Sequence, residues 1–221
     1  MEMDILGEKD ITRDGLGWVE AKLKDLTRYC GTRMKAWSKG LFIAALAILA
    51  TAIPLAAAHS SSASQSAPQS FTYVLGQGIL CSLEEKACPD IAMSDNGDMV
   101  ALNGTGTLST HAKSVTGGGM FVHMDSSGHE LVHGTWEAKD LLSFVSYGDA
   151  TPQGLPANLF GGKAVIHVSL LVGGTVVHDG ILTVYCVLGN PPHGAHEGVR
   201  LVVQDVINFN KQVSGDTVFV K

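Results

Sequence analysis

The chain beyond residue 58 has no cluster of basic residues. Residues 59–221 contain seven Lys and Arg against fourteen Asp and Glu, which is a formal charge of −7 with the histidines neutral. Nucleic-acid binding depends on a positively charged surface that contacts the phosphates. We therefore expect no nucleic-acid partner for this part of the chain.

Long amphipathic helical patterns are also missing beyond residue 58, so few helices are expected. Glycine is abundant, Val, Leu and Thr recur, and short apolar runs are separated by turn signals. This composition is typical of one all-β domain with many short turns. About eight to ten mostly antiparallel strands are expected, and they fit both a β-sandwich and a closed β-barrel. We favour a single antiparallel β-sandwich, with the closed barrel as the alternative.

No known catalytic motif is present. Serine, histidine and aspartate all occur, but none lies in G-x-S-x-G or another activating context. The glycines at 117–119 are followed by strand-like residues, whereas a phosphate loop needs a following helix and usually a lysine. We interpret these glycines as a flexible turn. The sequence therefore favours a non-catalytic protein, and an enzyme stays open as an alternative.

Cysteine is scarce. The chain has four, and only Cys81, Cys88 and Cys186 lie beyond residue 58. A disulfide is expected in an exported protein, but three cysteines cannot all pair within one chain. Because Cys81 ends an early apolar run and Cys186 lies on an apolar strand face, we expect the disulfide Cys81–Cys186. The alternative is Cys81–Cys88, which would close a local loop.

The longest apolar run is LFIAALAILATAIPLAAA at 41–58. Arg33, Lys35 and Lys39 precede it and three alanines end it, which is the pattern of a secretory signal peptide with its cleavage site. A membrane anchor is the alternative, but a spanning helix needs about 20 apolar residues, and Pro54 disfavours its C-terminal part. We expect a secreted or periplasmic protein, which contacts the membrane only through this segment if the segment is not cleaved.

The chain before the β-domain divides into three parts. Met34 begins MKAWSKG, which runs directly into the apolar core. We therefore expect 34–58 to be the signal peptide and 1–33 to be an upstream extension or a cytosolic arm. The polar, Ser-rich sequence 59–70 cannot build a core and is expected to be a linker. The β-domain is then 71–221, which is long enough for one hydrophobic core.

Several stretches between residues 104 and 221 resemble a group of uncharacterised secreted bacterial proteins. The stretches are SVTGGG at 114–119, LLSF at 141–144 with Tyr147-Gly148, GNPP at 189–192 and INFNK at 207–211. The resemblance implies export. It implies no particular activity, cofactor or site residue.

Two hairpins can be predicted from their turns. Asn-Gly is the strongest short hairpin signal, because a type I′ turn needs positive φ at both central residues. A two-residue turn at 96–97 pairs Met93 with Val100, and this register places the apolar residues of both strands on one face. The two glycines at 173–174 predict the second hairpin.

One candidate metal site lies in a loop near the end of the chain. His193, His196 and Glu197 are close in sequence and could bind zinc or another divalent metal. Their spacing is not H-E-x-x-H, and the neighbouring prolines and glycine disfavour the helix that such a motif needs. Solvated loop histidines are therefore the alternative interpretation.

The second candidate metal site is the pair His167 and His178. A regular hairpin at 173–174 places them diagonally on one sheet face, about 7–8 Å apart at Cα, which is near enough for two imidazoles to share a metal. Two exposed strand residues are the alternative, since only two ligands are identified. In the preceding hairpin, His123 is expected opposite Glu130 as a cross-strand polar pair.

Three aromatic residues are the candidate ligand-binding residues. Trp136, Tyr147 and Phe160 flank the Gly- and Pro-rich loop 148–162, and loops of this length in compact domains are often functional. Aromatic side chains beside a loop can stack on sugars or apolar ligands. Burial in the core is the alternative.

These observations favour a non-catalytic exported β-domain that binds a small ligand, a glycan or a protein at the cell surface or in the periplasm. No cofactor is expected for such a domain. A metal-dependent enzyme that uses the loop or strand histidines is one alternative, and its cofactor would be a divalent metal. A structural surface or matrix protein is the other alternative.

Overall fold

The computed structural model describes residues 69–221. The expected upstream segment 1–33, the expected signal peptide 34–58 and all but the last two residues of the linker 59–70 lie outside the described residues. Within the described part of the chain, no helix is long and apolar enough to cross a membrane.

Strands make up most of residues 69–221. They are β1 (Ser70–Leu75), β2 (Asp90–Met93), β3 (Met99–Ser109), β4 (Ser114–Met124), β5 (Glu130–Asp149), β6 (Leu159–Val172), β7 (Thr175–Cys186), β8 (Gly198–Val203), β9 (Ile207–Phe209), β10 (Lys211–Ser214) and β11 (Thr217–Val220). The helical segments are the short helix α3 (Ile79–Leu83) and the 3-10 helices η1 (Glu85–Ala87) and η2 (Thr151–Gln153). Every strand pair is antiparallel, so the expected all-β fold with few helices is confirmed.

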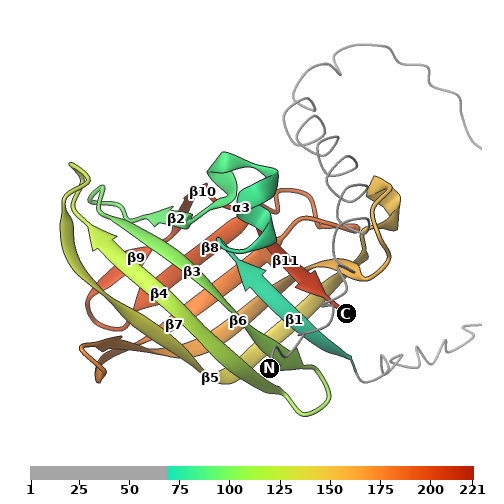
Figure 1. The fold of residues 1–221 in the computed structure, drawn as a ribbon. Coiled ribbons are helices and arrows are strands. Elements are labelled where there is room, and N and C mark those ends of the chain that lie inside the picture. The colour runs from blue at the N-terminus through green and yellow to red at the C-terminus, as the bar shows by residue number, and fades with distance from the viewer. Residues whose placement is uncertain (1–68) are drawn as a thin grey trace, which may run out of the picture.

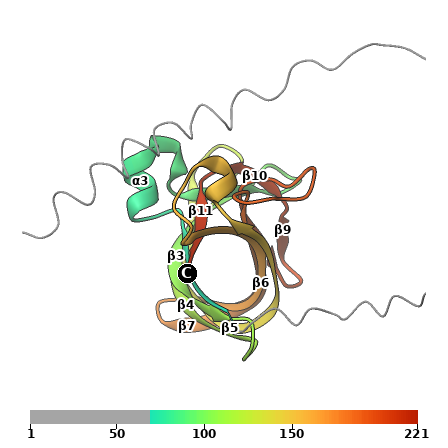
Figure 2. The ribbon, with the colours of Figure 1, turned by 90° about the vertical axis from the view of Figure 1, so that its right-hand side faces the viewer.

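All eleven strands belong to one hydrogen-bonded sheet, and six of them close a ring. The ring runs from β1 through β3, β4, β5, β6 and β11 back to β1. Figure 2 shows the ring viewed along its axis. Two branches continue the sheet: β7, β8 and β9 extend from β6, and β2 and β10 extend from β3 (Figure 1). β8 lies against both β2 and β10, so the two branches meet.

The length and the irregular pairing of β5 help to close the ring. β5 has 20 residues, and its pairing with β6 shifts register at three places. A β-bulge bends a strand and increases its twist. The bulges therefore let β5 follow a curved path between β4 and β6.

One face of the sheet is apolar and buried. Side chains two residues apart in a strand point to the same face, and the buried residues follow this period: Ala164, Ile166 and Val168 on β6, and Leu182 and Val184 on β7. Equivalent residues of the other strands join them in one hydrophobic cluster. The inner face of the sheet is therefore the core of the domain.

Glycines in β3 and β4 let these strands pack closely beneath Trp136. Gly104 pairs with Gly119, which in turn pairs with Trp136 on β5. A Cβ atom at Gly104 would lie 2.3 Å from Cζ2 of Trp136, so no larger residue fits there. Residues 117–119 thus lie inside β4, and their interpretation as a flexible turn was wrong.

The hairpin between β2 and β3 has a three-residue turn and not the predicted two-residue turn. The amide of Ser94 donates to the carbonyl of Asp98 at 2.9 Å, and the amide of Gly97 donates to the carbonyl of Ser94 at 3.2 Å. Gly97 has a φ of 93°, which makes this a type I turn followed by a left-handed glycine. The extra residue moves the register, so Val100 pairs with Ala92, and the predicted register was wrong.

The disulfide joins Cys81 and Cys88, which was the alternative pairing. Cys81 lies in α3 and Cys88 follows η1, so the bond closes the short segment that precedes β2. Cys186 is a free thiol on the buried face of β7, and burial raises its pKa. The predicted pairing Cys81–Cys186 was wrong, because an apolar strand face predicts burial of Cys186 but not its distance from Cys81.

Candidate ligand-binding site

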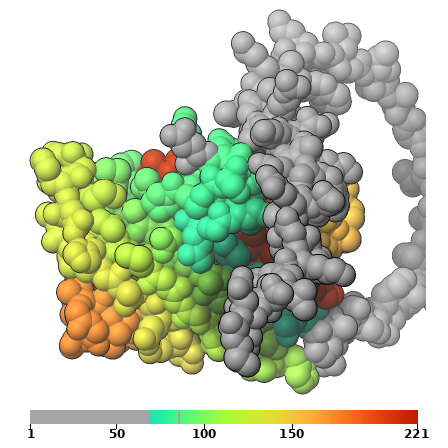
Figure 3. All heavy atoms as spheres, in the orientation of Figure 1, coloured from blue at the N-terminus to red at the C-terminus, as the bar shows by residue number. Residues whose placement is uncertain are grey.

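An apolar cavity of about 310 Å³ lies at one end of the sheet, against its inner face. Eleven of the thirteen lining residues are apolar, and the other two are histidines. The lining residues are Val100, Phe121, His123, Val132, Leu170, Val172, Val177, His178, Leu201, Val203, Val206, Ile207 and Phe209. The turns between β4 and β5 and between β6 and β7 lie at the same end of the molecule (Figure 1 and Figure 3).

The walls of the cavity follow from the alternation of side chains along the strands. β4, β6, β8 and β9 each contribute two residues spaced two apart, and such residues point to the same face of a strand. These pairs are Phe121 and His123, Leu170 and Val172, Leu201 and Val203, and Ile207 and Phe209. The cavity is thus a continuation of the hydrophobic core toward solvent.

The mouth of the cavity carries exposed apolar side chains. Val206 is 57% exposed and Val177 is 43% exposed, and His178 beside Val177 is also exposed. Leu201 and Phe209 are only 1% exposed, so the cavity has a buried floor. Removing apolar surface from water is favourable by about 25 cal/mol per Å², so this mouth and floor suit an apolar ligand.

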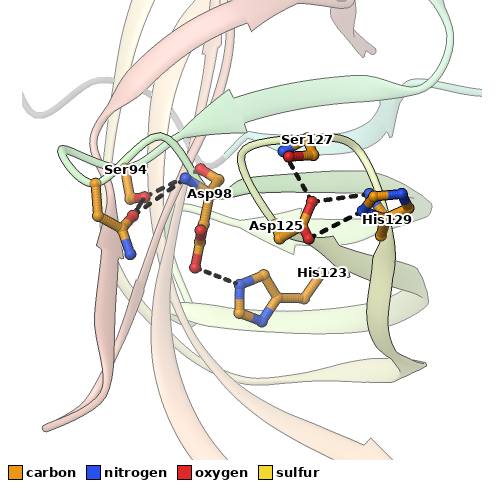
Figure 4. Close-up of polar contacts among 7 residues, drawn as sticks. Ser94, Asp98, His123, Asp125, Ser127 and His129 are labelled. Atoms are coloured by element: carbon orange, nitrogen blue, oxygen red, sulfur yellow. Dashed lines mark hydrogen bonds and ion pairs between the residues drawn. The ribbon is translucent and has the colours of Figure 1, made fainter.

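His123 is the polar side chain in the wall formed by β4. The pairing of β4 with β5 shifts register just after His123, which therefore lies opposite Val132, and the predicted pairing with Glu130 was wrong. The His123 ring packs edge-on against Phe209, with 5.3 Å between the ring centroids. Its Nε2 lies 3.4 Å from Oδ2 of Asp98, and a dashed line marks this contact in Figure 4.

The turn between β2 and β3 fixes the backbone of Asp98. Ser94 donates to the Asp98 carbonyl from its amide at 2.9 Å and from its hydroxyl at 3.0 Å. The Asp98 amide donates to Oδ1 of Asn96 at 3.1 Å. The side chains of Asp98 and His123 are 20% and 21% exposed, so their contact is largely shielded from water. The turn therefore places the Asp98 carboxylate beside the His123 ring in the cavity wall.

A second pair of Asp and His lies in the turn between β4 and β5 (Figure 4). Oδ1 of Asp125 accepts hydrogen bonds from the amides of Ser127 at 2.8 Å and His129 at 2.9 Å, and Oδ2 lies 3.2 Å from Nδ1 of His129. The hydrogen bond from the His129 amide lowers the pKa of Asp125. The His129 side chain is 80% exposed and does not line the cavity. This pair therefore belongs to the turn and not to the cavity wall.

The strand histidines lie on opposite faces of the sheet. The hairpin at 173–174 is confirmed, but Val177 forms a bulge that shifts all the later pairs of β6 and β7. As a result His178 lines the cavity, whereas His167 lies on the outer face with its Nδ1 3.0 Å from Oδ2 of Asp140. Because one extra residue turns a side chain to the other face, the predicted shared face was wrong.

The loop residues of the other candidate metal site also separate. His193 and His196 are exposed, whereas the Glu197 carboxylate accepts hydrogen bonds from the amide of Val187 at 2.7 Å and from the amide and hydroxyl of Thr217 at 2.9 and 3.0 Å. Burial raises the pKa of Glu197 to about 7. Within residues 69–221, no three His, Cys, Asp or Glu residues are grouped so that they could hold a metal ion. The structure thus assembles neither predicted metal site.

The three predicted aromatic residues do not line the cavity. Trp136 is 1% exposed and donates from Nε1 to the carbonyl of Asn103 at 2.9 Å. Phe160 packs against Phe71 with 5.2 Å between ring centroids. Tyr147 is half-buried, and burial raises its pKa. Trp136 and Phe160 therefore serve the packing of the core, which was the alternative interpretation.

Of the residues that line the cavity, the sequence predicted only His178 as a site residue, and it did so for a metal site. The Phe121–His123 spacing assigns both side chains to one strand face, but the spacing does not show whether that face is inside. Phe209 lies in a three-residue strand that is too short for a periodic pattern. These residues meet only because the branches from β6 and β3 fold toward each other.

Comparisons of the chain with protein-family models, with curated proteins and with solved structures found no match. The cavity and the residues around it are therefore the evidence from which a function can be proposed.

Proposed function

We propose that this chain is an exported, non-catalytic domain that binds a small apolar ligand in the cavity between β4, β7, β8 and β9. The observation that carries the proposal is the cavity itself, which has apolar walls, a buried floor and an exposed mouth. Small-molecule sites are usually concave and mostly apolar, with a few polar groups that orient the ligand. His123 and His178 are the polar groups here.

The volume of the cavity indicates the size of the ligand. An apolar cavity of about 150 Å³ can hold one benzene molecule, and this cavity has about 310 Å³. A ligand about the size of two fused aromatic rings, or of a medium-length alkyl chain, is therefore expected.

The closed ring of strands supports the barrel alternative over the β-sandwich, and with it a ligand-binding role. Six strands return to their starting point through hydrogen bonds. A closed sheet of about eight strands has an interior that side chains fill or that holds one small ligand. Here side chains fill the middle of the sheet, and the cavity lies at one end.

Export is part of the proposal. The signal-like segment 34–58 supports it, because its basic flank, apolar core and small-residue end match a secretory signal. The disulfide Cys81–Cys88 also supports it, because disulfides persist mainly in oxidising compartments.

Binding of naphthalene tests the proposal, because naphthalene is neutral, apolar and of the expected size. Val203 lines the cavity and is 6% exposed, whereas its neighbour Val202 is 40% exposed on the outer face of β8. In isothermal titration calorimetry we expect Val203→Phe, which fills the cavity, to weaken naphthalene binding by about tenfold or more. Val202→Phe should leave the affinity unchanged.

Circular dichroism checks that both variants keep the strand content of the unchanged protein. Failure of the unchanged protein to bind naphthalene contradicts the proposal. Equal loss of affinity in folded Val202→Phe and Val203→Phe also contradicts it, because the ligand would then not occupy the cavity.

A further inference from the structure

We propose that the ligand is a neutral apolar alcohol or phenol whose hydroxyl group donates a hydrogen bond to Nδ1 of His123. This inference rests on the proposed binding of an apolar ligand in the cavity. It adds the chemical class of that ligand.

His123 is the more enclosed of the two polar residues that line the cavity. Only two of the thirteen lining residues are polar, and of these His178 is exposed at the mouth. The His123 side chain is 21% exposed and packs against the buried ring of Phe209. A hydrogen bond made away from bulk water discriminates strongly between ligands, because a buried polar group without a partner is costly.

Asp98 determines which nitrogen of His123 carries the proton. Oδ2 of Asp98 lies 3.4 Å from Nε2 of His123, and an ionised carboxylate can only accept a hydrogen bond. A neutral His123 ring therefore carries its proton on Nε2, and Nδ1 is left as an acceptor. Among the described residues, no side chain or backbone group donates to this Nδ1.

An acceptor at Nδ1 selects a ligand with a donor. A hydroxyl group can donate to it, whereas a hydrocarbon leaves it unpaired. A ligand carboxylate would bring its own lone pairs toward Nδ1 and toward the nearby Asp98, and it would lose its hydration in an apolar cavity. The cavity thus favours a neutral hydroxyl compound over both a hydrocarbon and an acid.

Three probes with the same carbon frame test this inference: naphthalene, 2-naphthol and 2-naphthoate. The three probes are compared by isothermal titration calorimetry at about pH 7.5. One hydrogen bond in a shielded site corresponds to an affinity about 3- to 10-fold higher. We expect 2-naphthol to bind more tightly than naphthalene by this factor and 2-naphthoate to bind most weakly.

Two variants locate the preference at the pair of His123 and Asp98. His123→Phe removes the acceptor, so the ratio of the 2-naphthol affinity to the naphthalene affinity should fall to about one. Asp98→Asn keeps the shape of the side chain, but its amide group can donate a hydrogen bond to Nε2. The proton of the neutral ring can then lie on Nδ1, which no longer accepts a hydrogen bond. The 2-naphthol advantage should then fall while naphthalene binding stays, so this variant tests the role even if His123→Phe does not fold.

The matched control is the second pair, Asp125 and His129. Asp125→Asn and His129→Phe change the same residue types in the neighbouring turn, outside the cavity wall. Both should keep the full preference for 2-naphthol.

Each of three results overturns the inference. Equal binding of naphthalene and 2-naphthol leaves the apolar ligand site standing but removes the hydroxyl preference. Tightest binding of 2-naphthoate shows that His123 acts as a cation and not as an acceptor. Absence of binding by all three probes removes the proposed function and this inference together.

Discussion

The carboxyl group of Asp90 lies in an environment that disfavours its charge. Asp90 is 0% exposed, and within residues 69–221 neither carboxyl oxygen has a hydrogen-bond partner. Burial, together with the nearby carboxylates of Glu197 and Asp216, raises its pKa to about 9. The backbone at Gly215 approaches so closely that a Cβ there would lie 2.4 Å from Oδ1 of Asp90. Asp90 therefore stays protonated in the folded protein at neutral pH.

This raised pKa predicts a stability that falls as the pH rises. Below about pH 4 the group is protonated in both states, whereas between about pH 4 and 9 only the unfolded chain loses the proton. The free energy of unfolding should therefore fall across this range, and Asp90→Asn should reduce the slope. Glu197, with its pKa raised to about 7, adds to the fall at the acidic end of the range in both proteins.

Urea unfolding followed by circular dichroism at several pH values measures the slope. Asp95→Asn is the control, because the Asp95 side chain is 78% exposed. The Asp90→Asn protein should gain stability relative to the unchanged protein as the pH rises, and Asp95→Asn should not. Parallel pH profiles for the unchanged protein and Asp90→Asn would contradict the prediction.

At the scale of elements, strands could be predicted from the sequence and their exact register could not. Alternating apolar residues identify β6 and β7, and the glycines at 173–174 identify their hairpin. The bulge residue Val177 and the unpaired Leu131 in β5 are apolar like their neighbours. Nothing in the pattern marks them as extra residues, so the faces of His123 and His178 could not be assigned correctly.

A disulfide holds the segment from α3 to η1 and closes a short loop. Because the loop is short, we expect the disulfide to contribute only moderately to the free energy of unfolding. Cys81 and Cys88 are seven residues apart. In the chain-entropy model a loop of this size contributes about 2–3 kcal/mol, against about 4.7 kcal/mol for a loop of 100 residues such as Cys81–Cys186 would close. We expect the double variant Cys81→Ser with Cys88→Ser to lose about 2–3 kcal/mol of unfolding free energy in urea titration.

Cys186→Ala distinguishes the two pairings. It leaves the disulfide Cys81–Cys88 intact, so non-reducing peptide mapping by mass spectrometry should still find the linked peptides. Detection of a peptide linking Cys81 to Cys186 in the unchanged protein would show that the pairing in the structure is not the one formed.

At the scale of the whole molecule, the ring and its cavity could not be predicted because both depend on pairs distant in sequence. β11 pairs with β1 and with the first residues of β6, and these contacts link both ends of the described chain to its middle. Hydrophobic alternation assigns residues to a face but carries no information about which strands become neighbours. The cavity needs both branches of the sheet, so its residues come together only in the completed fold.

β11 is therefore the element whose removal tests the ring. Phe219 in β11 is 0% exposed, and the amide and hydroxyl of Thr217 donate hydrogen bonds to the Glu197 carboxylate. Ending the chain after Asp216 opens the ring, exposes apolar core and leaves that carboxylate without these donors, so we expect no cooperative unfolding transition in urea. Removing Lys221 alone deletes one hydrogen bond, from its amide to the carbonyl of Asn158, and should cost only about 1 kcal/mol. An unchanged urea midpoint after loss of 217–221 would mean that the sheet is stable without closure of the ring.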